Sequence, residues 1–250
     1  IEEKQVVNFN VDSGENILIN PEETVKPLII QNNDLKRSVG NIPPQYSIGN
    51  LLQYRYDDET SFYAGNEFFD YDNKDIRAAT NRVQYIELLK LYHNYLYGNN
   101  TRKDAVYTYN PDLNGNFQIN TIQGDQPKVN AEYAWIHFSL DHPQRPEDEE
   151  IHLYGNFNNF VIEDATKLQF NPENQRYELP ILLKQGYYNY RYVVVKDGKM
   201  LKYNPVDGDF WQTENVYDVL VYYRAPGSRY DELIGRGNAL STSISNVRRD

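Results

Sequence analysis

Apolar and polar residues alternate over short stretches in the first part of the chain, and each stretch ends in a cluster of turn-forming residues. The run QVVNFNV, residues 5–11, meets the cluster DSGEN. The apolar run VKPLIIQ, residues 25–31, ends at two asparagines and an aspartate, and the runs LLQYRY and NEFFDY follow in the same manner. Side chains on a strand point alternately to two faces, so this period of two predicts short β-strands joined by turns.

The segment NRVQYIELLKLYHNYLY, residues 81–97, fits two kinds of element. Five of its apolar side chains also fit one face of a helix: Tyr85, Leu88, Leu89, Tyr92 and Tyr95. The neighbouring segments are strand-like and rich in tyrosine. We therefore favour two strands over one helix.

The clearest local turn signal lies in DAVYTYNPDLNGNFQINTI, residues 104–122. Asn114 and Gly115 stand between two alternating runs. The pair Asn-Gly accepts the positive φ angles of a type I′ turn, which is the turn that joins two antiparallel strands most closely. We expect a β-hairpin here.

A second series of strands begins after QGDQPKVN, residues 123–130, where the apolar pattern stops. Strands are expected in AEYAWIHFSL, IHLYGNFNNF, KLQFNPENQRYELPILL, GYYNYRYVVVKDGKM and ENVYDVLVYYR. A turn at residues 171–174 and a hairpin turn at Asp197 and Gly198 separate some of them. About seven strands at short spacing, with no helical pattern between them, are typical of an immunoglobulin-like sandwich.

The predicted organisation is all-β, with two tandem β-sandwich domains. Residues 1–126 form the first domain, and residues 127–225 form the second, which is immunoglobulin-like or E-set-like. Residues 226–250 lose the period of two and gain Gly, Ser, Asn and Arg, which predicts a mobile C-terminal tail. The chain starts at Ile1 with neither an initiator methionine nor a signal peptide, so we expect it to be truncated at its N-terminus.

Composition supports this fold class and narrows the possible partners. The 250 residues contain 23 tyrosines and 2 tryptophans, and tyrosine suits the half-buried surface of a sheet. The formal net charge of −11 argues against a nucleic-acid partner, because such affinity rests on clustered Lys and Arg. No run approaches the roughly eighteen apolar residues of a membrane helix, so we expect no direct membrane insertion. The chain has no cysteine, which excludes disulfides and thiolate metal sites.

Two features of the sequence are candidates for a metal site. The stretch DLNGN, from Asp112 to Asn116, begins like a calcium loop, but Gln123 stands where the last acidic ligand is expected. His137 and His152 could lie on neighbouring strands, yet two histidines without further ligands are more often structural. The remaining histidines, His93 and His142, add no HxxxH or HExxH spacing. We predict no metal and no cofactor.

Catalytic motifs are missing from the sequence. It has no GxSxG nucleophile turn, no glycine-rich phosphate loop and no GxGxxG after a strand. A glycosidase would need two carboxylates facing each other across a cleft, but the carboxylates here gather in loop-like stretches such as YDDET and RPEDEE. Solvated loops explain them, and we expect no enzymatic activity.

Carbohydrate binding is the alternative function. The segments YGNFNNF, YYNYRYVVVKDG and FWQTEN, in this order, resemble the glycogen- and starch-binding modules that adjoin amylase-type enzymes. Those modules commonly carry tryptophan where this chain has Phe160. Sugar faces stack on exposed aromatic rings, and the candidates for such stacking are Phe160, Tyr188 and Trp211.

A wider resemblance covers nearly the whole chain. The segments AGNEFFDYDNKDIRAATNRVQYIEL, YTYNPDLNGNFQIN, EYAWIHFSL, LLKQGYYNYRYVV and DFWQTENVYDVLVYYRAPGSRYDELIG follow one another as in the type IX secretion system plug proteins of the Bacteroidota, formerly a domain of unknown function. The resemblance implies tandem β-sandwiches that close the periplasmic end of the giant outer-membrane β-barrel translocon. It implies a periplasmic protein associated with the outer membrane, without catalytic residues. The acidic balance would keep it monomeric when free.

Residues for the contact with the translocon are predicted from charge. In YYRAPGSRYDELIGRG, residues 222–237, several side chains depart from the acidic trend of the chain: Arg224, Arg229, Tyr230 and Arg236. A solvated tail explains the same residues equally well. They are the candidate partner contacts.

Overall fold

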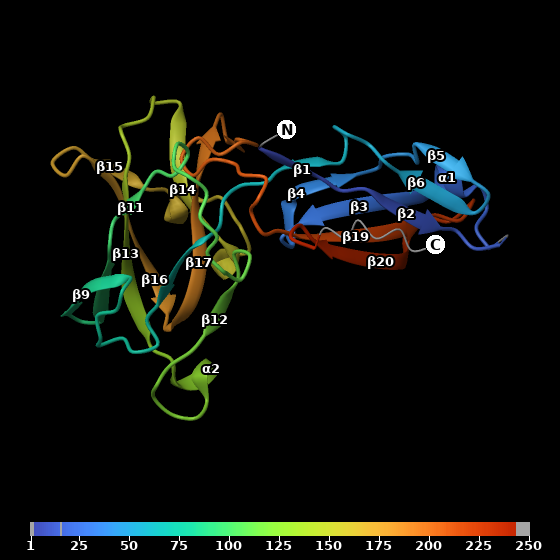
Figure 1. Ribbon diagram of the computed structural model, residues 1–250. Coiled ribbons are helices and arrows are strands. Elements are labelled where there is room, and N and C mark those ends of the chain that lie inside the picture. Colours follow the sequence, from blue (N-terminus) through green and yellow to red (C-terminus); the bar gives the residue numbers. More distant parts are fainter. Residues whose placement is uncertain (1–2, 16, 244–250) are drawn as a thin grey trace. The chain divides into compact units, whose positions relative to one another are not determined.

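The computed structural model describes residues 3–15 and 17–243 and divides the chain into two compact units. Unit 1 consists of Ile1–Ala64 and Phe210–Asp250, and unit 2 consists of Gly65–Asp209 (Figure 1). Strands dominate both units, and their sheets pack as β-sandwiches. This confirms the predicted all-β fold class.

In the described residues of unit 1, the sheets run in the orders β20-β19-β3-β4, β2-β6-β5 and β1-β7. The elements are β1 (Lys4–Val6), β2 (Phe9–Asp12), α1 (Pro21–Thr24), β3 (Val25–Gln31), β4 (Asp34–Gly40), β5 (Tyr46–Ile48), β6 (Leu51–Tyr54), β7 (Ser61–Tyr63), β19 (Val216–Tyr223) and β20 (Glu232–Leu240). Ile29 of β3, Tyr54 of β6 and Tyr217 of β19 meet in one buried cluster. The core of unit 1 therefore joins residues from both ends of the chain.

Unit 2 contains a large sheet, in the order β15-β16-β13-β10-β9 with β11 beside β13, and a facing sheet, in the order β12-β17-β14 with β8 and β18 on β17. The strands are β8 (Phe69–Asp72), β9 (Val83–Leu88), β10 (Tyr92–Leu96), β11 (Asn99–Asn100), β12 (Phe117–Ile119), β13 (Tyr133–Asp141), β14 (Glu149–Tyr154), β15 (Gln169–Asn171), β16 (Arg176–Lys184), β17 (Gly186–Lys196) and β18 (Lys199–Met200). Short helical turns are α2 (Pro127–Asn130), η1 (Asn156–Asn158) and η2 (Asp164–Thr166).

The core of unit 2 follows from alternation along its longest strands. Every second residue of β13 is buried, from Ala134 to Leu140. These side chains meet Tyr190 and Tyr192 of β17 in one cluster. The residues between them on β13 point to the outer face of the large sheet, away from this core.

The predicted domain boundaries are wrong. The expected division after residue 126 falls inside unit 2. The two units also do not follow one another along the chain, because the sequence of unit 2 is inserted between the two sequence segments of unit 1. The stretch ENVYDVLVYYR was assigned to the second domain, but it forms β19, which pairs with β3 from Tyr217 opposite Gln31 to Tyr223 opposite Val25. Alternation identifies a strand but not the strand with which it pairs.

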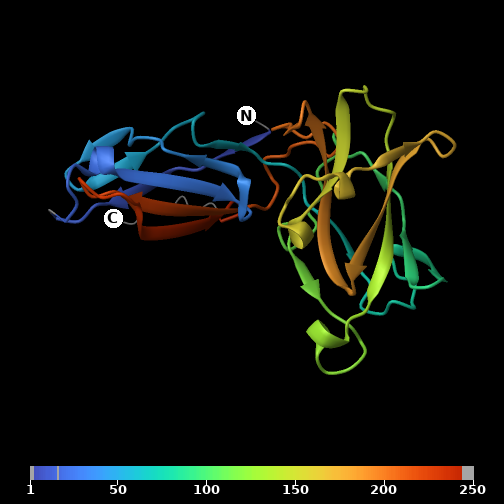
Figure 2. The same ribbon diagram turned by 180° about the vertical axis from the view of Figure 1, so that it is seen from behind.

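The predicted mobile tail is also wrong for residues 232–240. Glu232–Leu240 forms β20, which pairs antiparallel with β19. In the sheet, β20 lies next to β19, which in turn pairs with the blue β3 (Figures 1 and 2). Gly235 and Gly237 hid the strand, because glycine is rare in strands and has no side chain to show a period of two. Residues 244–250 of the predicted tail lie outside the described residues.

The local predictions had mixed outcomes. Residues 83–96 form two antiparallel strands, β9 and β10, as favoured over a helix. Asp197 and Gly198 join β17 to β18 in the expected hairpin. Asn114 and Gly115 also adopt the expected positive φ angles of 52° and 83°, but no hairpin forms there. The residues before them form no strand, and β12 after them pairs with β17.

Side-chain hydrogen bonds explain why that hairpin does not form. The backbone N–H of Leu113 donates to the side-chain oxygen of Asn189 on β17. The carboxylate of Asp112 accepts from the backbone N–H of Phe68, at 2.6 Å. The backbone N–H of Leu113, which a hairpin could use, is thereby bound to β17, and the side chain of Asp112 is bound to the segment before β8.

Gly186, the first residue of β17, provides a test of the close approach of β12 to β17. A Cβ added to Gly186 would overlap the backbone carbonyl oxygen of Gln118, which cannot rotate away. We expect Gly186→Ala to lower the free energy of unfolding by about 1–3 kcal/mol, because overpacking shifts the backbone. Gly198→Ala is not a matched control, since its φ is 70°. Urea titration measures this loss. In the same titration, Ala134→Gly removes a buried methyl group without creating a clash, so it shows how much stability is lost when packing alone is reduced.

Candidate functional site

The outer face of the large sheet carries aromatic rings on neighbouring strands. On β13, Trp135 and His137 alternate with the buried Ala134 and Ile136. On β10, the outward positions beside buried Asn94 and Leu96 are His93 and Tyr95. With Tyr85 of β9, these outward rings define the aromatic face: Tyr85, His93, Tyr95, Trp135 and His137.

Strand register places the rings in two rows. Tyr95 lies opposite Tyr85 of β9 and opposite His137 of β13, and Pro180 of β16 follows His137 in the same row. In the second row, His93 lies opposite Trp135. The chain order of these strands does not reveal the rows, because β10 and β13 pair in parallel across a connection of 36 residues.

The rings of the first row stack on one another. The ring centroids of Tyr85 and Tyr95 are 4.2 Å apart with an interplanar angle of 10°, and those of Tyr95 and His137 are 4.0 Å apart at 15°. Strands are spaced about 4.7–4.9 Å apart, so the rings fill the space between neighbouring strands. Tyr95, which stacks with Tyr85 and with His137, therefore has both faces of its ring covered.

Polar groups accompany these rings. The hydroxyl of Tyr95 donates to Glu87 Oε2 at 3.1 Å, and burial, followed by this carboxylate, raises the pKa of Tyr95. His93 Nδ1 lies 2.9 Å from His137 Nε2, so one imidazole donates to the other. Burial and the neighbouring His93 lower the pKa of His137, while the more distant Glu87 and Glu178 oppose that shift. The His137 imidazole is thereby held in its neutral form near pH 7.

A shallow depression of about 500 Å³ adjoins the aromatic face, with Tyr85, His137, Arg176 and Glu178 in its lining. Arg176 Nε forms an ion pair with Asp141 at 3.2 Å. Glu178 accepts hydrogen bonds from the side-chain amides of two asparagines, Asn171 and Asn174. The charged groups that line the depression are thus bound to neighbouring side chains, and they do not form a pair of free carboxylates.

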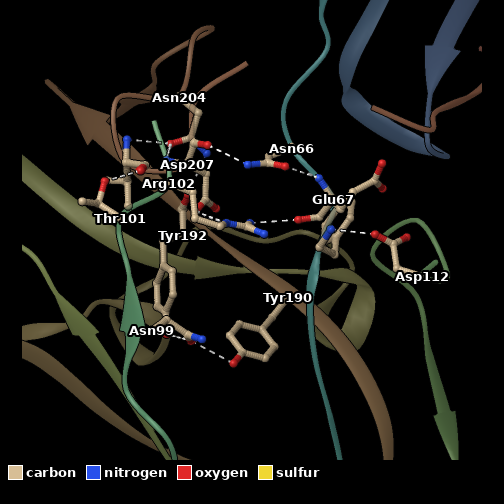
Figure 3. A network of polar contacts seen from close by, with 12 residues as sticks. Asn66, Glu67, Asn99, Thr101, Arg102, Asp112, Tyr190, Tyr192, Asn204 and Asp207 are labelled. Atoms are coloured by element: carbon tan, nitrogen blue, oxygen red, sulfur yellow. Dashed lines mark hydrogen bonds and ion pairs between the residues drawn. The ribbon is translucent and has the colours of Figure 1, made fainter. Parts of the chain in front are cut away.

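A second polar cluster lies inside unit 2, where the segments after Gly65 and before Asp209 meet. Figure 3 shows Arg102 reaching both neighbours: its Nε contacts Asp207 Oδ1 at 3.2 Å, and its Nη2 donates to the backbone oxygen of Glu67 at 2.8 Å. The guanidinium also lies over the ring of Phe69, 3.6 Å from its centroid. Asn66 adds a hydrogen bond from its side-chain amide to the backbone oxygen of Asp207.

Two tyrosines continue the cluster toward the core. The hydroxyls of Tyr190 and Tyr192 both donate to Asn99 Oδ1, at 2.9 and 2.8 Å (Figure 3). Burial raises the pKa of each tyrosine far above its ordinary value, so both remain donors at any physiological pH. Since Glu67 and Asp207 are buried as well, the cluster offers no carboxylate to a substrate. We interpret it as a structural network.

The candidate sugar-stacking residues do not form a platform. Phe160 and Tyr188 are 5% and 2% exposed, whereas Trp211 is 50% exposed and belongs to unit 1. Both ring faces of Tyr188 are covered, by Tyr71 at 5.1 Å and by Phe117 at 5.4 Å. The prediction is wrong for both residues. Phe160 lies in the turn after η1 and packs against Tyr154 at 5.2 Å. Tyr188 lies on β17, where alternation alone does not show which face of the strand is covered.

The candidate partner contacts lie on unit 1, around β19 and β20. Arg224 makes two hydrogen bonds of 2.8 Å to Asp231, and Arg236 bonds Asp218 at 2.7 and 3.1 Å. Arg229 and Tyr230 are exposed in the turn between the strands. Two of the four candidates thus pair with carboxylates of their own unit, so the net positive charge that they offer a partner is smaller than the sequence suggests.

The aromatic face was missed at the level of the sequence. The signals were in YHNYL, where His93 and Tyr95 stand two positions apart, and in AWIHF, where Trp135 and His137 do so. His137 was considered as a neighbour of His152, but His152 is buried on β14 and contacts Thr166. Only the parallel pairing of β10 with β13 brings His93 to His137.

Further observations limit the kinds of site. Within residues 3–15 and 17–243, no helix is both long and apolar enough to cross a membrane. Over the same residues, no three or more side chains of His, Asp or Glu gather where they could hold a metal ion.

Comparison with known proteins identifies the fold rather than a function. No protein-family model matches the chain, and no curated protein is significantly similar to it. A crystal structure of a hypothetical protein from Parabacteroides merdae is similar, with a TM-score of 0.89 and 31% sequence identity. The match covers 96% of this chain and 60% of the other protein, so the chain spans about three fifths of that protein's length. The likeness extends through both units and supports the all-β sandwich architecture.

Proposed function

We propose that the chain is a non-enzymatic binding protein that contacts a protein partner through the aromatic face. The observation that carries this proposal is the nearly parallel stacking of Tyr85, Tyr95 and His137 on the outer face of the large sheet. Aromatic side chains supply large contact areas at small entropic cost, and their polar edges bond a partner. A sugar ring needs an open ring face, whereas a protein surface can pack against edges.

Within this proposal, the partner is the giant outer-membrane β-barrel translocon of type IX secretion. The chain would close its periplasmic end, as the sequence resemblance implies. It would be a periplasmic protein associated with the outer membrane and a monomer when free. The all-β sandwich architecture agrees with that resemblance.

Binding of the purified chain to the purified translocon in detergent tests this proposal. Trp135 and Tyr85 are the anchors to replace, because tryptophan and tyrosine dominate binding energy at interfaces. We expect the double variant Tyr85→Ala/Trp135→Ala to bind about 30-fold more weakly, corresponding to a loss of about 2 kcal/mol.

The matched control is Tyr46→Ala in unit 1. Tyr46 is 57% exposed and Tyr85 is 50% exposed, so a similar ring is lost from a different surface. Equal weakening by the control and the double variant would contradict the role of the aromatic face. A chain that ignores the translocon but is retained on immobilised glucans would replace the proposal with carbohydrate binding.

A further inference from the structure

Two imidazoles meet on the aromatic face. His93 on β10 and His137 on β13 belong to parallel neighbouring strands and lie two positions apart in the register. His93 Nδ1 and His137 Nε2 are 2.9 Å apart, and both rings are partly exposed. Two ring nitrogens thus converge at a place that solvent can reach.

This spacing matches two ligands of one transition-metal ion. Metal–imidazole bonds of about 2.0–2.1 Å place two nitrogens about 2.9 Å apart at a right angle and about 3.3 Å apart in a tetrahedron. The two nitrogens, 2.9 Å apart and joined by one N–H···N hydrogen bond, are spaced like neighbouring corners of a square or an octahedron. A metal ion would replace this hydrogen bond when the donor ring carries its proton on its other nitrogen. Tetragonal nitrogen and oxygen sites are typical of Cu²⁺ and Ni²⁺.

The packing around His137 limits the movement of its ring. The ring of Tyr95 stacks on His137 at 4.0 Å and restricts its rotation. Glu178 lines the same depression as His137 and supplies negative charge nearby.

We propose that His93 and His137 form a two-imidazole site for a divalent transition-metal ion, which prefers Cu²⁺ over Ni²⁺ and Zn²⁺. This preference follows the general order of affinities of divalent ions for nitrogen ligands. Because the described residues bring no third such ligand to the pair, the other coordination positions are open to water or to a donor atom of a bound molecule. The proposal does not rest on a contact with the translocon, and its test uses the chain alone; both histidines nevertheless belong to the aromatic face.

Titration of the full chain with Cu²⁺ alone, in a weakly coordinating buffer, tests the site. Calorimetry should show one ion whose binding weakens at least about tenfold in His93→Gln and in His137→Gln, as expected when a ligand is removed. Electron paramagnetic resonance should show two coupled imidazole nitrogens in the unchanged chain. His142→Gln removes a histidine on the loop after β13 and should leave both measurements unchanged.

A measurement on the unchanged chain guards against variants that fold poorly. Substoichiometric Cu²⁺ should broaden the NMR signals of the His93 and His137 rings before those of His142 and His152. The proposal is overturned if the chain does not bind Cu²⁺, if His93→Gln/His137→Gln binds it equally well, or if other histidine signals broaden first.

Discussion

Replacing Arg102 by methionine is expected to lower the free energy of unfolding of unit 2 by about 3–5 kcal/mol. The guanidinium of Arg102 lies 3.2 Å from a carboxylate of Asp207, whose side chain is 1% exposed, compared with 23% for Arg102. Methionine keeps much of the contact with Phe69 but leaves the Asp207 charge buried without its cation. The loss comes mainly from that uncompensated charge.

Urea denaturation followed by tryptophan fluorescence measures this loss in unit 2. The chain has one tryptophan in each unit, so a Trp211→Phe background leaves Trp135 as the probe of unit 2. A shift of the midpoint at unchanged slope reports the change in stability.

Arg82→Met is the matched control in the same unit. The pair of Arg82 with Asp70, at 3.0 Å, has side chains that are 47% and 17% exposed, so its loss should cost less than about 1 kcal/mol. The double variant Arg102→Met/Asp207→Asn should recover part of the loss, because the buried charge is gone. Equal effects of Arg102→Met and Arg82→Met would show that burial of Asp207 does not govern stability.

Truncation of Phe138 to alanine is expected to cost about 3–5 kcal/mol of unfolding free energy. Phe138 is buried at the centre of unit 2, where its ring meets Tyr190 edge to face at 4.9 Å and Tyr71 at 5.7 Å. Alanine leaves a cavity between the large sheet and the facing sheet that β13 and β17 cannot close without breaking their own pairings.

The same fluorescence titration compares Phe138→Ala with Tyr97→Ala. Tyr97 follows β10 and is exposed, so loss of its ring should change stability by no more than about 0.5 kcal/mol. Its backbone N–H, which donates to the oxygen of Arg82, is kept in the variant. If both variants lost the same stability, the cluster around Phe138 would not be the core of unit 2.

Part of the candidate site could be predicted from local pattern. Alternation in YHNYL and AWIHF indicates that His93, Tyr95, Trp135 and His137 share a direction within each strand. It does not indicate that the two strands are neighbours. Parallel pairing across a long connection leaves no local signature, so the His93–His137 contact was not foreseen.

For Tyr188, a candidate for sugar stacking, the sequence suggests an exposed ring, but the ring is buried. On an ordinary strand of an antiparallel sheet one face is solvated, and an aromatic residue can be interpreted as exposed. β17 is covered on both faces along most of its length, so Tyr188 is buried although its neighbours in sequence are polar. Segments far away in the chain cover its outer face: the backbone N–H of Leu113 donates to Asn189, and the guanidinium of Arg191 lies over the ring of Phe68.

The sequence by itself determined the fold class, the strands at residues 83–96 and 216–223, and the positive φ angles at Asn114 and Gly115. These are local properties, set by side-chain alternation and by the backbone freedom of single residues. The tertiary structure alone decided that β19 returns to β3, that unit 2 lies between two segments of unit 1, and that rings from β9, β10 and β13 form one surface. Hydrogen bonds between strands join backbone groups that are the same in every residue, so the choice of partner rests on the packing of the whole unit.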